Sequence, residues 1–242
     1  MLRRVSPFMY TVILIPGLVS DHLVWSHLAE ALAPSCPVVT AELTEGDNIR
    51  DWAAGLLARH EGPLLAVGHS MGGRVALEMA RQAPDRMAGL VLANTGHGPK
   101  KAGEEEKRHA MIALAHRDIE AMIDSWLPGM LAADRVADES VAAPLAAMVR
   151  RAGAAVHERQ IRALLDRPDA TAYLGAITCP VLAVAADADR WSPIPQHQEI
   201  VAAVPDARLV VIEGAGHFAP VERPAAVTQA ILQWIEERFP RD

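Results

Sequence analysis

A serine flanked by glycines, in the run Gly68–Gly73 (GHSMGG), is the residue of this chain best suited to nucleophilic chemistry. The run follows an apolar segment, Leu64–Val67, and precedes a segment with helical periodicity that begins at Arg74. Glycines two residues before and two after Ser70 permit a tight strand-to-helix turn that a Cβ would obstruct. Such a turn sets the Ser70 hydroxyl at a helix N-terminus, where free N–H groups favour negative charge. The pattern therefore predicts a serine nucleophile.

A serine hydroxyl needs a nearby base to remove its proton, so the chain should also carry a suitably placed histidine. His217 is the best candidate of the ten histidines, because it lies in a glycine-rich loop, Gly214–Phe218 (GAGHF). This loop follows the apolar run Leu209–Ile212, which predicts a strand. Open α/β sheets place their active sites in loops at the carboxyl ends of strands. We therefore predict that His217 is the general base.

The carboxylate that orients this histidine should also follow a strand. Asp187 and Asp189 both come soon after the apolar run Val181–Ala185. We favour Asp189, because it lies deeper in the loop and can reach across to His217, whereas Asp187 fits a turn-capping role. The resulting order along the chain is serine, aspartate, histidine, which is the order of hydrolases built on a G-x-S-x-G turn.

Acyl transfer also requires N–H donors that stabilise the oxyanion. The backbone N–H of Met71, the residue after the serine, is one candidate. The second candidate is the N–H of Leu18, in the turn Ile15–Leu18 (IPGL) after the first apolar run. Because both donors belong to the backbone, the side chains at these two positions are free to vary.

Short segments that are apolar throughout recur along the chain and predict strands buried on both faces, as in a parallel sheet. These segments are Thr11–Ile15, Val38–Val39 in weaker form, Leu64–Val67, Leu90–Leu92, Val181–Ala185 and Leu209–Ile212. Helical patterns lie between them. We therefore predict a doubly wound α/β fold with about six mostly parallel strands flanked by helices.

The alternation of strands and helices stops after Ala93. From about residue 97 to residue 177 the pattern is helical throughout, and eighty residues are too many for a loop. The sequence therefore predicts a helical cap at 97–177, inserted into a core formed by residues 1–96 and 178–242.

Several side chains are candidates for lining a substrate pocket under this cap. Methionines can shape an adaptable apolar wall, although helix packing explains them equally well. The candidates are Trp25, Met111, Met122, Trp126 and Met130. Arginines of the predicted cap suit a substrate carboxylate, but a solvated helix face accounts better for most of them; they are Arg117, Arg150, Arg151 and Arg159.

The composition and net charge of the chain argue against some classes of binding partner. The chain has 242 residues and a formal net charge of −7, which argues against a nucleic-acid-binding surface. Apolar runs are too short to span a membrane. Neither a phosphate-binding loop nor a metal cluster is recognisable, and the two cysteines make no metal pattern. We expect a cytoplasmic enzyme that acts on a small molecule without metal or cofactor; the oligomeric state is left open.

Taken together, these motifs resemble the α/β-hydrolase superfamily, from about Thr11 to Phe239. The strongest marks are Gly68–Gly73, the Asp189-x-x-x-Pro193 segment and Gly214–His217. One departure is Pro16-Gly17, where many relatives carry His-Gly. The resemblance implies a cap between two strands, and parts of the chain are similar to small bacterial esterases, lactonases and carbon–carbon bond hydrolases.

We therefore expect a serine hydrolase that cleaves a small carboxylic ester or a lactone through an acyl-enzyme on Ser70. One alternative keeps the same triad for cleaving ring-cleavage diketones, or for a lyase reaction similar to that of the menaquinone-pathway synthase, whose turn also reads Ser-Met-Gly-Gly-Arg. A second alternative is a ligand receptor that hydrolyses very slowly.

Overall fold

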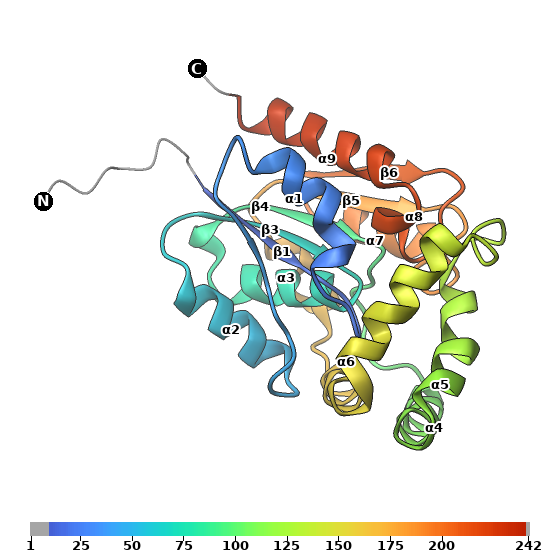
Figure 1. The fold of residues 1–242 in the computed structure, drawn as a ribbon. Helices are drawn as coiled ribbons and strands as arrows, with labels where there is room; N and C mark the ends of the chain where they lie inside the picture. The colour runs from blue at the N-terminus through green and yellow to red at the C-terminus, as the bar shows by residue number, and fades with distance from the viewer. Residues whose placement is uncertain (1–9, 241–242) are drawn as a thin grey trace, which may run out of the picture.

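One sheet of six parallel strands forms the centre of the computed structural model, which describes residues 10–240 (Figure 1). The strands are β1 (Thr11–Ile15), β2 (Val38–Thr40), β3 (Leu64–His69), β4 (Met87–Ala93), β5 (Val181–Ala186) and β6 (Ala207–Ile212). They are ordered β2-β1-β3-β4-β5-β6, and every pairing is parallel. Parallel neighbours require crossover connections, which the helices supply. The predicted α/β fold is confirmed.

Burial differs between the middle and the edges of this sheet. Every residue of β3 and β5 is buried, which explains why these segments are apolar throughout. The edge strands β2 and β6 are only partly buried, and Val211 in β6 is exposed. The prediction of burial on both faces is therefore wrong for Leu209–Ile212. An edge strand has a neighbour on one side only, so part of its surface stays in contact with solvent.

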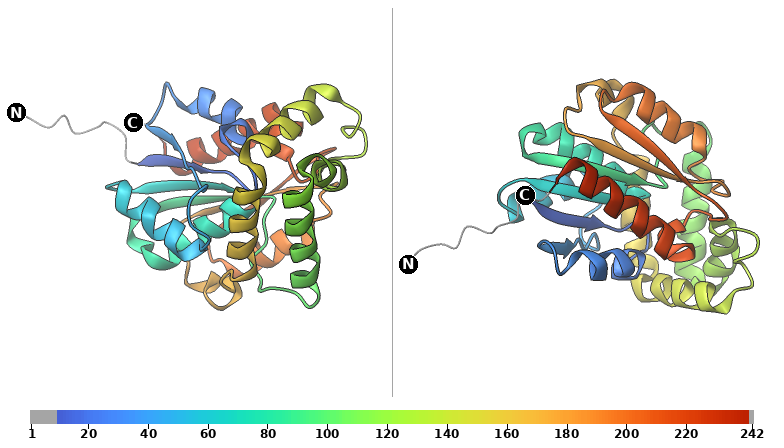
Figure 2. Two further views of the ribbon diagram at one scale, coloured as in Figure 1. Left: turned by 60° about the horizontal axis from the view of Figure 1, so that its bottom comes forward. Right: turned by 90° about the horizontal axis from the view of Figure 1, so that it is seen from above.

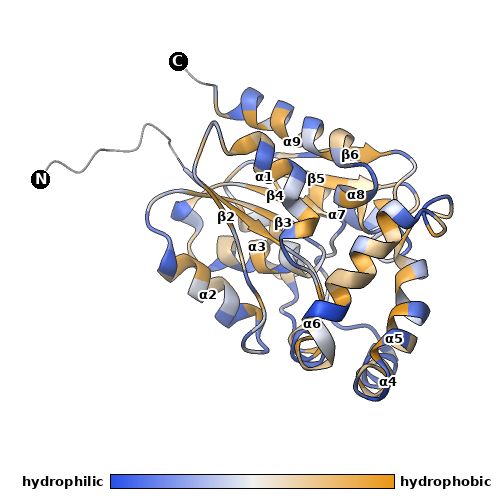
Figure 3. Ribbon diagram, viewed as in Figure 1, coloured by the Kyte–Doolittle hydropathy of each residue, from blue (hydrophilic) through white to orange (hydrophobic). Residues whose placement is uncertain are grey.

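Helices cover both faces of the sheet (Figure 2). On one face α1 (Ser26–Leu32) and α9 (Pro224–Arg238) pack on the strands, and on the other lie α2 (Ile49–Arg59), α3 (Met71–Gln82) and α7 (Ile194–Ala203). Each layer buries its apolar side chains against the sheet and turns its polar side outward (Figure 3). Short helical turns complete this part: η1 (His22–Trp25), η2 (Pro84–Arg86) and α8 (Ala219–Glu222).

The segment between β4 and β5 is helical and lies beyond the carboxyl ends of the strands (Figure 1). Its elements are α4 (Glu104–Arg117), α5 (Ile119–Trp126), η3 (Leu127–Met130), α6 (Glu139–Leu165), η4 (Ala170–Ala172) and η5 (Leu174–Ala176). Gly153 interrupts α6 with a φ of +73°. Within residues 10–240, no helix combines the length and the apolar character needed to cross a membrane.

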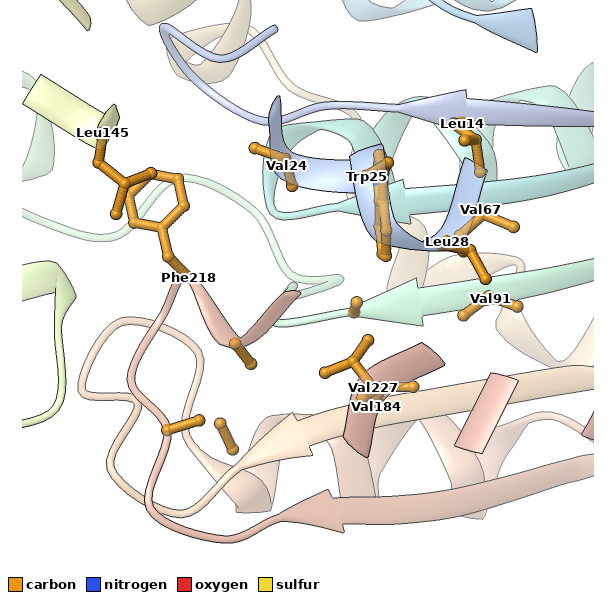
Figure 4. Packing of buried hydrophobic residues seen from close by; sticks show 14 of the residues in the cluster. Leu14, Val24, Trp25, Leu28, Val67, Val91, Leu145, Val184, Phe218 and Val227 are labelled. Carbon is orange, nitrogen blue, oxygen red and sulfur yellow. The ribbon is translucent and has the colours of Figure 1, made fainter. Parts of the chain in front are cut away.

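This helical segment shares a hydrophobic core with the sheet (Figure 4). Phe218, in the loop after β6, is 1% exposed and makes an edge-to-face contact with Trp126 at 6.0 Å between ring centroids. Leu145 from α6 lies beside the same ring (Figure 4). Because one loop packs against both α5 and α6, the helical segment and the loop that follows β6 form a single packed unit.

Two glycines allow the turn between β3 and α3 to approach β1 closely. A Cβ on Gly68 would lie 2.3 Å from the carbonyl oxygen of Gly72. A Cβ on Gly72 would lie 2.2 Å from the carbonyl oxygen of Ile15, at the end of β1. Both atoms that would be met belong to backbone, which cannot rotate away. Close backbone packing therefore requires glycine at positions 68 and 72, independently of any role of Ser70.

Replacing Gly72 with alanine should destabilise the protein by about 3 kcal/mol or more, because the added methyl group forces α3 away from β1. Gly129→Ala is the matched control, since a Cβ there meets no atom within 4 Å. Thermal unfolding of both variants, followed by circular dichroism, measures the difference. Equal melting temperatures would contradict the packing explanation.

Candidate active site

Ser70 lies between β3 and α3 in a backbone conformation that side chains rarely adopt. Its φ of 53° and ψ of −114° fall outside the usual regions for a residue other than glycine. Two hydrogen bonds from the end of β4 hold it there: the Ser70 N–H donates to Ala93 O at 2.9 Å, and the Thr95 hydroxyl donates to Ser70 O at 2.6 Å. With this strained backbone, Ser70 lies just beyond the carboxyl end of β3 and borders a cavity.

The structure brings Ser70, His217 and Asp189 into one hydrogen-bonded chain. The distance from Ser70 Oγ to His217 Nε2 is 2.8 Å, and His217 Nδ1 lies 2.9 Å from Asp189 Oδ2 and 3.1 Å from its Oδ1. A carboxylate can only accept, so Nδ1 carries the proton and Nε2 is left to accept from the serine hydroxyl. The three residues are therefore arranged so that the hydroxyl proton can pass to the imidazole.

Asp189 is buried, and its charge is held by several donors. Its Oδ1 accepts from the N–H groups of Trp191 at 2.8 Å and Ser192 at 3.0 Å. Burial alone raises the pKa of this carboxyl, but His217 and these N–H donors outweigh burial and hold the pKa well below its usual range. Asp187, the other candidate, is exposed.

Asn94 joins the loop of the aspartate to the loop of the histidine. Its Nδ2 donates to Asp189 Oδ2 at 3.0 Å and to Gly216 O at 3.3 Å. The residue is buried and has a φ of 48°, directly after β4. The sequence shows that Asn94 follows a strand. It does not show that the fold places Asp189 and Gly216 next to the Asn94 side chain.

His69 holds the backbone of His217 through a side-chain hydrogen bond. Its Nε2–H donates to His217 O at 2.7 Å. Burial, together with the nearby His217, lowers the pKa of His69 to about 3, so the ring is neutral.

Glu222 ties the same loop to the helical segment. Its buried carboxylate accepts from Gly216 N at 3.0 Å and from Ala132 N at 2.8 Å, and His217 N donates to Met130 O at 2.6 Å. Burial raises the pKa of Glu222, although the N–H donors act in the opposite direction. The sequence gives no sign of this role, because a glutamate in a short helix does not reveal its buried backbone partners.

Leu18 and Met71, the predicted oxyanion donors, both line the cavity beside Ser70. Leu18 follows the end of β1, and Met71 is the first residue of α3. Among the described residues, no acceptor is found for the N–H of either one. The first N–H groups of a helix have no partner within the helix and remain available to a ligand.

A cavity of about 440 Å³ opens next to Ser70 and His217, within the size range of small-molecule sites. Met111 and Trp126 from the helical segment lie on its wall, and Met130 lines a smaller hollow that also reaches the serine. In the described part of the chain, no cluster of histidine, cysteine, aspartate or glutamate is arranged to hold a metal ion.

Trp25 and Met122 were also predicted at the pocket, and here the structure differs. Neither side chain belongs to the cavity wall. Trp25 is 1% exposed, packs against the sheet near Leu14 and donates its indole N–H to Ile15 O at 3.2 Å (Figure 4). Met122 is fully buried among the helices. Helical periodicity identifies an apolar face, but it does not separate residues facing a cavity from residues facing another helix.

Similarity to known proteins accords with this geometry. Residues 12–230 match the family described as the alpha/beta hydrolase family. The chain belongs to this family.

Among its relatives is a putative carbamate hydrolase, RutD, of Pseudomonas savastanoi, which is 27% identical over 90% of this chain and 85% of its own length. The polyketide synthase ThaQ of Burkholderia thailandensis is 30% identical over 93% of this chain, which spans only 12% of ThaQ. A solved thermophilic esterase from Thermogutta terrifontis, with malate bound, has a TM-score of 0.86 and 26% identity over 95% of this hydrolase and 90% of the esterase.

Two buried histidines should make the stability of this hydrolase depend on pH. Burial lowers the pKa of His69 to about 3 and that of His157 to about 4, while both titrate near 6.5 in the unfolded chain. The unfolded state therefore binds more protons as the pH falls below 6.5. Between pH 7 and pH 5 each histidine should remove about 2 kcal/mol from the free energy of unfolding.

Urea unfolding at pH 7 and pH 5 measures this loss. The variant His157→Asn cannot titrate at this position, so its loss should be smaller than that of the wild type by about 2 kcal/mol. Equal losses in the two proteins would show that His157 does not contribute.

Proposed function

We propose that this protein is a serine hydrolase that cleaves a small carboxylic ester or a lactone through an acyl-enzyme on Ser70. The observation that carries this proposal is the hydrogen-bonded chain from Ser70 Oγ through His217 to the buried Asp189. The cavity beside the serine and the family membership support it. The names of relatives, which include an esterase and a carbamate hydrolase, point to carbonyl chemistry of this kind.

In the first half of the reaction His217 Nε2 accepts the proton of Ser70 as Oγ attacks the carbonyl carbon of the ester. The tetrahedral intermediate then collapses, the bond to the alcohol oxygen breaks, and His217 returns the proton to the leaving alcohol. Asp189 keeps the imidazole in its reactive tautomer and stabilises the imidazolium. The acyl group remains on Ser70.

In the second half His217 removes a proton from water, and the resulting hydroxide attacks the acyl carbon. Collapse of this intermediate breaks the bond to Ser70 Oγ, which takes the proton back, and the carboxylic acid leaves. In both halves the N–H groups of Leu18 and Met71 would stabilise the oxyanion, at the positive end of α3. No step requires a metal ion or a cofactor.

We further propose that residues 97–177 act as a cap that shapes the substrate site. Side chains from this segment, such as Met111 and Trp126, form one side of the cavity, while the triad comes from the loops of the sheet. Substrate selection would therefore depend on the helical segment and bond cleavage on the sheet.

A second candidate uses the same triad to cleave a carbon–carbon bond or to catalyse a lyase reaction. The turn sequence Ser-Met-Gly-Gly-Arg favours it, because Arg74 lies on the cavity wall near the nucleophile. Turnover of a vinylogous diketone above that of esters would select this candidate.

Hydrolysis of a p-nitrophenyl ester series, from acetate to octanoate, tests the proposed reaction. Ser70→Ala and His217→Ala should each lower kcat by at least about 10³-fold, since either change removes the activated nucleophile. The matched control is Ser140→Ala, which alters an exposed serine at the start of α6. Ester turnover that survives Ser70→Ala would rule out an acyl-enzyme on this residue.

The two aspartates after β5 provide a second test. Asp189→Asn should lower kcat by about 10³- to 10⁴-fold, because an amide no longer holds the reactive tautomer of His217. Asp187→Asn makes the same chemical change at an exposed position two residues away and should leave kcat within about twofold. A comparable loss in both variants would contradict the assignment of Asp189.

A further inference from the structure

The cavity beside Ser70 has a charge opposite to that of the whole chain. The formal net charge of the protein is −7, yet a single acidic residue, Glu104, belongs to the cavity wall. Five basic residues lie on the same wall: Arg74, Lys101, Lys107, Arg108 and Arg167. A concentration of positive charge in a concave site attracts anions and raises their local concentration.

The one carboxylate is already shared by two guanidinium groups. Arg167 donates to both oxygens of Glu104, at 2.8 and 2.7 Å, and Arg108 Nε donates to Glu104 Oε1 at 2.7 Å. The planar guanidinium group matches a carboxylate with two parallel hydrogen bonds. The site therefore already binds one carboxylate, which the protein itself supplies, and it still carries excess positive charge.

Arg74 lies in this region without an acidic partner among the described residues. Its one hydrogen bond is donated by Nη1 to the carbonyl oxygen of Gly98, at 2.9 Å. Burial, assisted by the charge of Arg167, lowers the pKa of Arg74 to about 9. Arg74 is partly buried and has no ion pair of its own among the described residues, although the charge of Glu104 acts on it. An anionic ligand beside it would stabilise its charge. Ser70 directly precedes α3 and Arg74 lies in its first turn, and both residues border the cavity.

His157 provides a second, independent sign of a ligand. It lies on the cavity wall and is 2% exposed, and its Nδ1 has no hydrogen-bond partner among the described residues. Burial lowers its pKa to about 4, so the ring is neutral and can donate a single N–H. Buried polar atoms in folded proteins almost always have a partner, so an unpaired nitrogen on a cavity wall points to a polar group that binds there.

The arginines that the sequence suggested for this purpose lie elsewhere. Arg150 is paired with Glu120, and Arg151 is paired with Asp21, on the outer surface of the helical segment. Arg159 donates to the carbonyl oxygen of Thr44. The three arginines of the cavity come instead from α3, α4 and the loop after α6.

We propose that Arg74 and Arg108 form a subsite for a carboxylate of the substrate, so that the natural substrate is an anionic ester, such as a half-ester of a dicarboxylic acid. Arg167 adds positive charge to this subsite but no hydrogen bond, because all five of its N–H groups already donate to Glu104 and to the carbonyl oxygens of Gly98, Pro99 and Leu164. This assignment of substrate class rests on the proposed hydrolysis at Ser70, whereas binding of a dicarboxylate to the subsite does not. Arg74 supplies a charge that has no ion pair among the described residues, and His157 supplies a neutral N–H on the wall of the same cavity.

A matched pair of substrates tests this subsite: mono-p-nitrophenyl adipate, which is anionic, and methyl p-nitrophenyl adipate, which has the same acyl chain without the charge. For the wild type kcat/KM should be at least about tenfold higher for the anionic ester at low salt, mainly through KM. This preference should shrink as salt is added. Equal or lower kcat/KM for the anionic ester would overturn the proposal.

Variants that each remove one positive charge test which arginines cause the preference for the anionic ester. Arg74→Gln and Arg108→Gln should each reduce the ratio of kcat/KM for the two esters by about fivefold or more. Arg150→Gln removes the same charge from an exposed position outside the cavity and should leave the ratio unchanged. Circular dichroism identifies the variants that fold. An unchanged ratio in folded Arg74→Gln and Arg108→Gln would overturn the subsite.

A binding experiment separates this proposal from the hydrolase reaction. Calorimetric titration of Ser70→Ala with adipate should show binding, which the additional change Arg74→Gln weakens about tenfold. If neither ester is hydrolysed and adipate still binds in this way, the proposed reaction fails and the subsite stands. If esters are hydrolysed and adipate does not bind, the subsite is overturned. Binding of inorganic phosphate in preference to adipate would overturn the carboxylate assignment.

Discussion

Four groups of His217 form hydrogen bonds: both ring nitrogens, the backbone N–H and the carbonyl oxygen. Together they fix the position of its imidazole. Its two ring nitrogens hydrogen-bond to Ser70 and Asp189, while its backbone N–H and carbonyl oxygen bond to Met130 and His69. The partners come from β3, from the loop after β5 and from the helical segment. An imidazole that is fixed in both position and tautomer can exchange one proton with the serine without first reorganising, which is the condition for rapid proton transfer.

The residues around the cavity come from two parts of the fold. Ser70, Asp189 and His217 lie on short loops at the carboxyl ends of parallel strands, where buried neighbours on both sides fix the backbone. The charges of the cavity come largely from α4 and the loop after α6, which pair with each other through Glu104 and Arg167. Within the described part of the chain, none of these charged residues is a hydrogen-bond partner of His217. This division fits a family whose members act on different substrates.

The sequence predicted the sheet correctly and named three residues that the structure joins by hydrogen bonds, because both predictions follow from local patterns. Continuous apolar runs mark buried strands, and a serine, an aspartate and a histidine after such runs must meet at one edge. Partners that depend on tertiary contacts were missed. Glu222 and Asn94 show their importance only through the N–H groups and oxygens opposite them, and Arg74 differs from the exposed Arg150 only in what surrounds it. Trp25 and Met122 were misplaced for the same reason, since an apolar residue can face either a core or a cavity.

The carboxylate of Glu222 accepts hydrogen bonds from Gly216, next to His217, and from Ala132, which lies between η3 and α6 in the middle of the helical segment. A rigid outward swing of the whole segment would therefore pull the imidazole away from Ser70. Lys101, Glu104 and Lys107 border the cavity from another part of this segment and make no hydrogen bond to the Gly216–His217 loop within the described residues. One buried acid therefore couples the position of the His217 imidazole to the position of the helical segment.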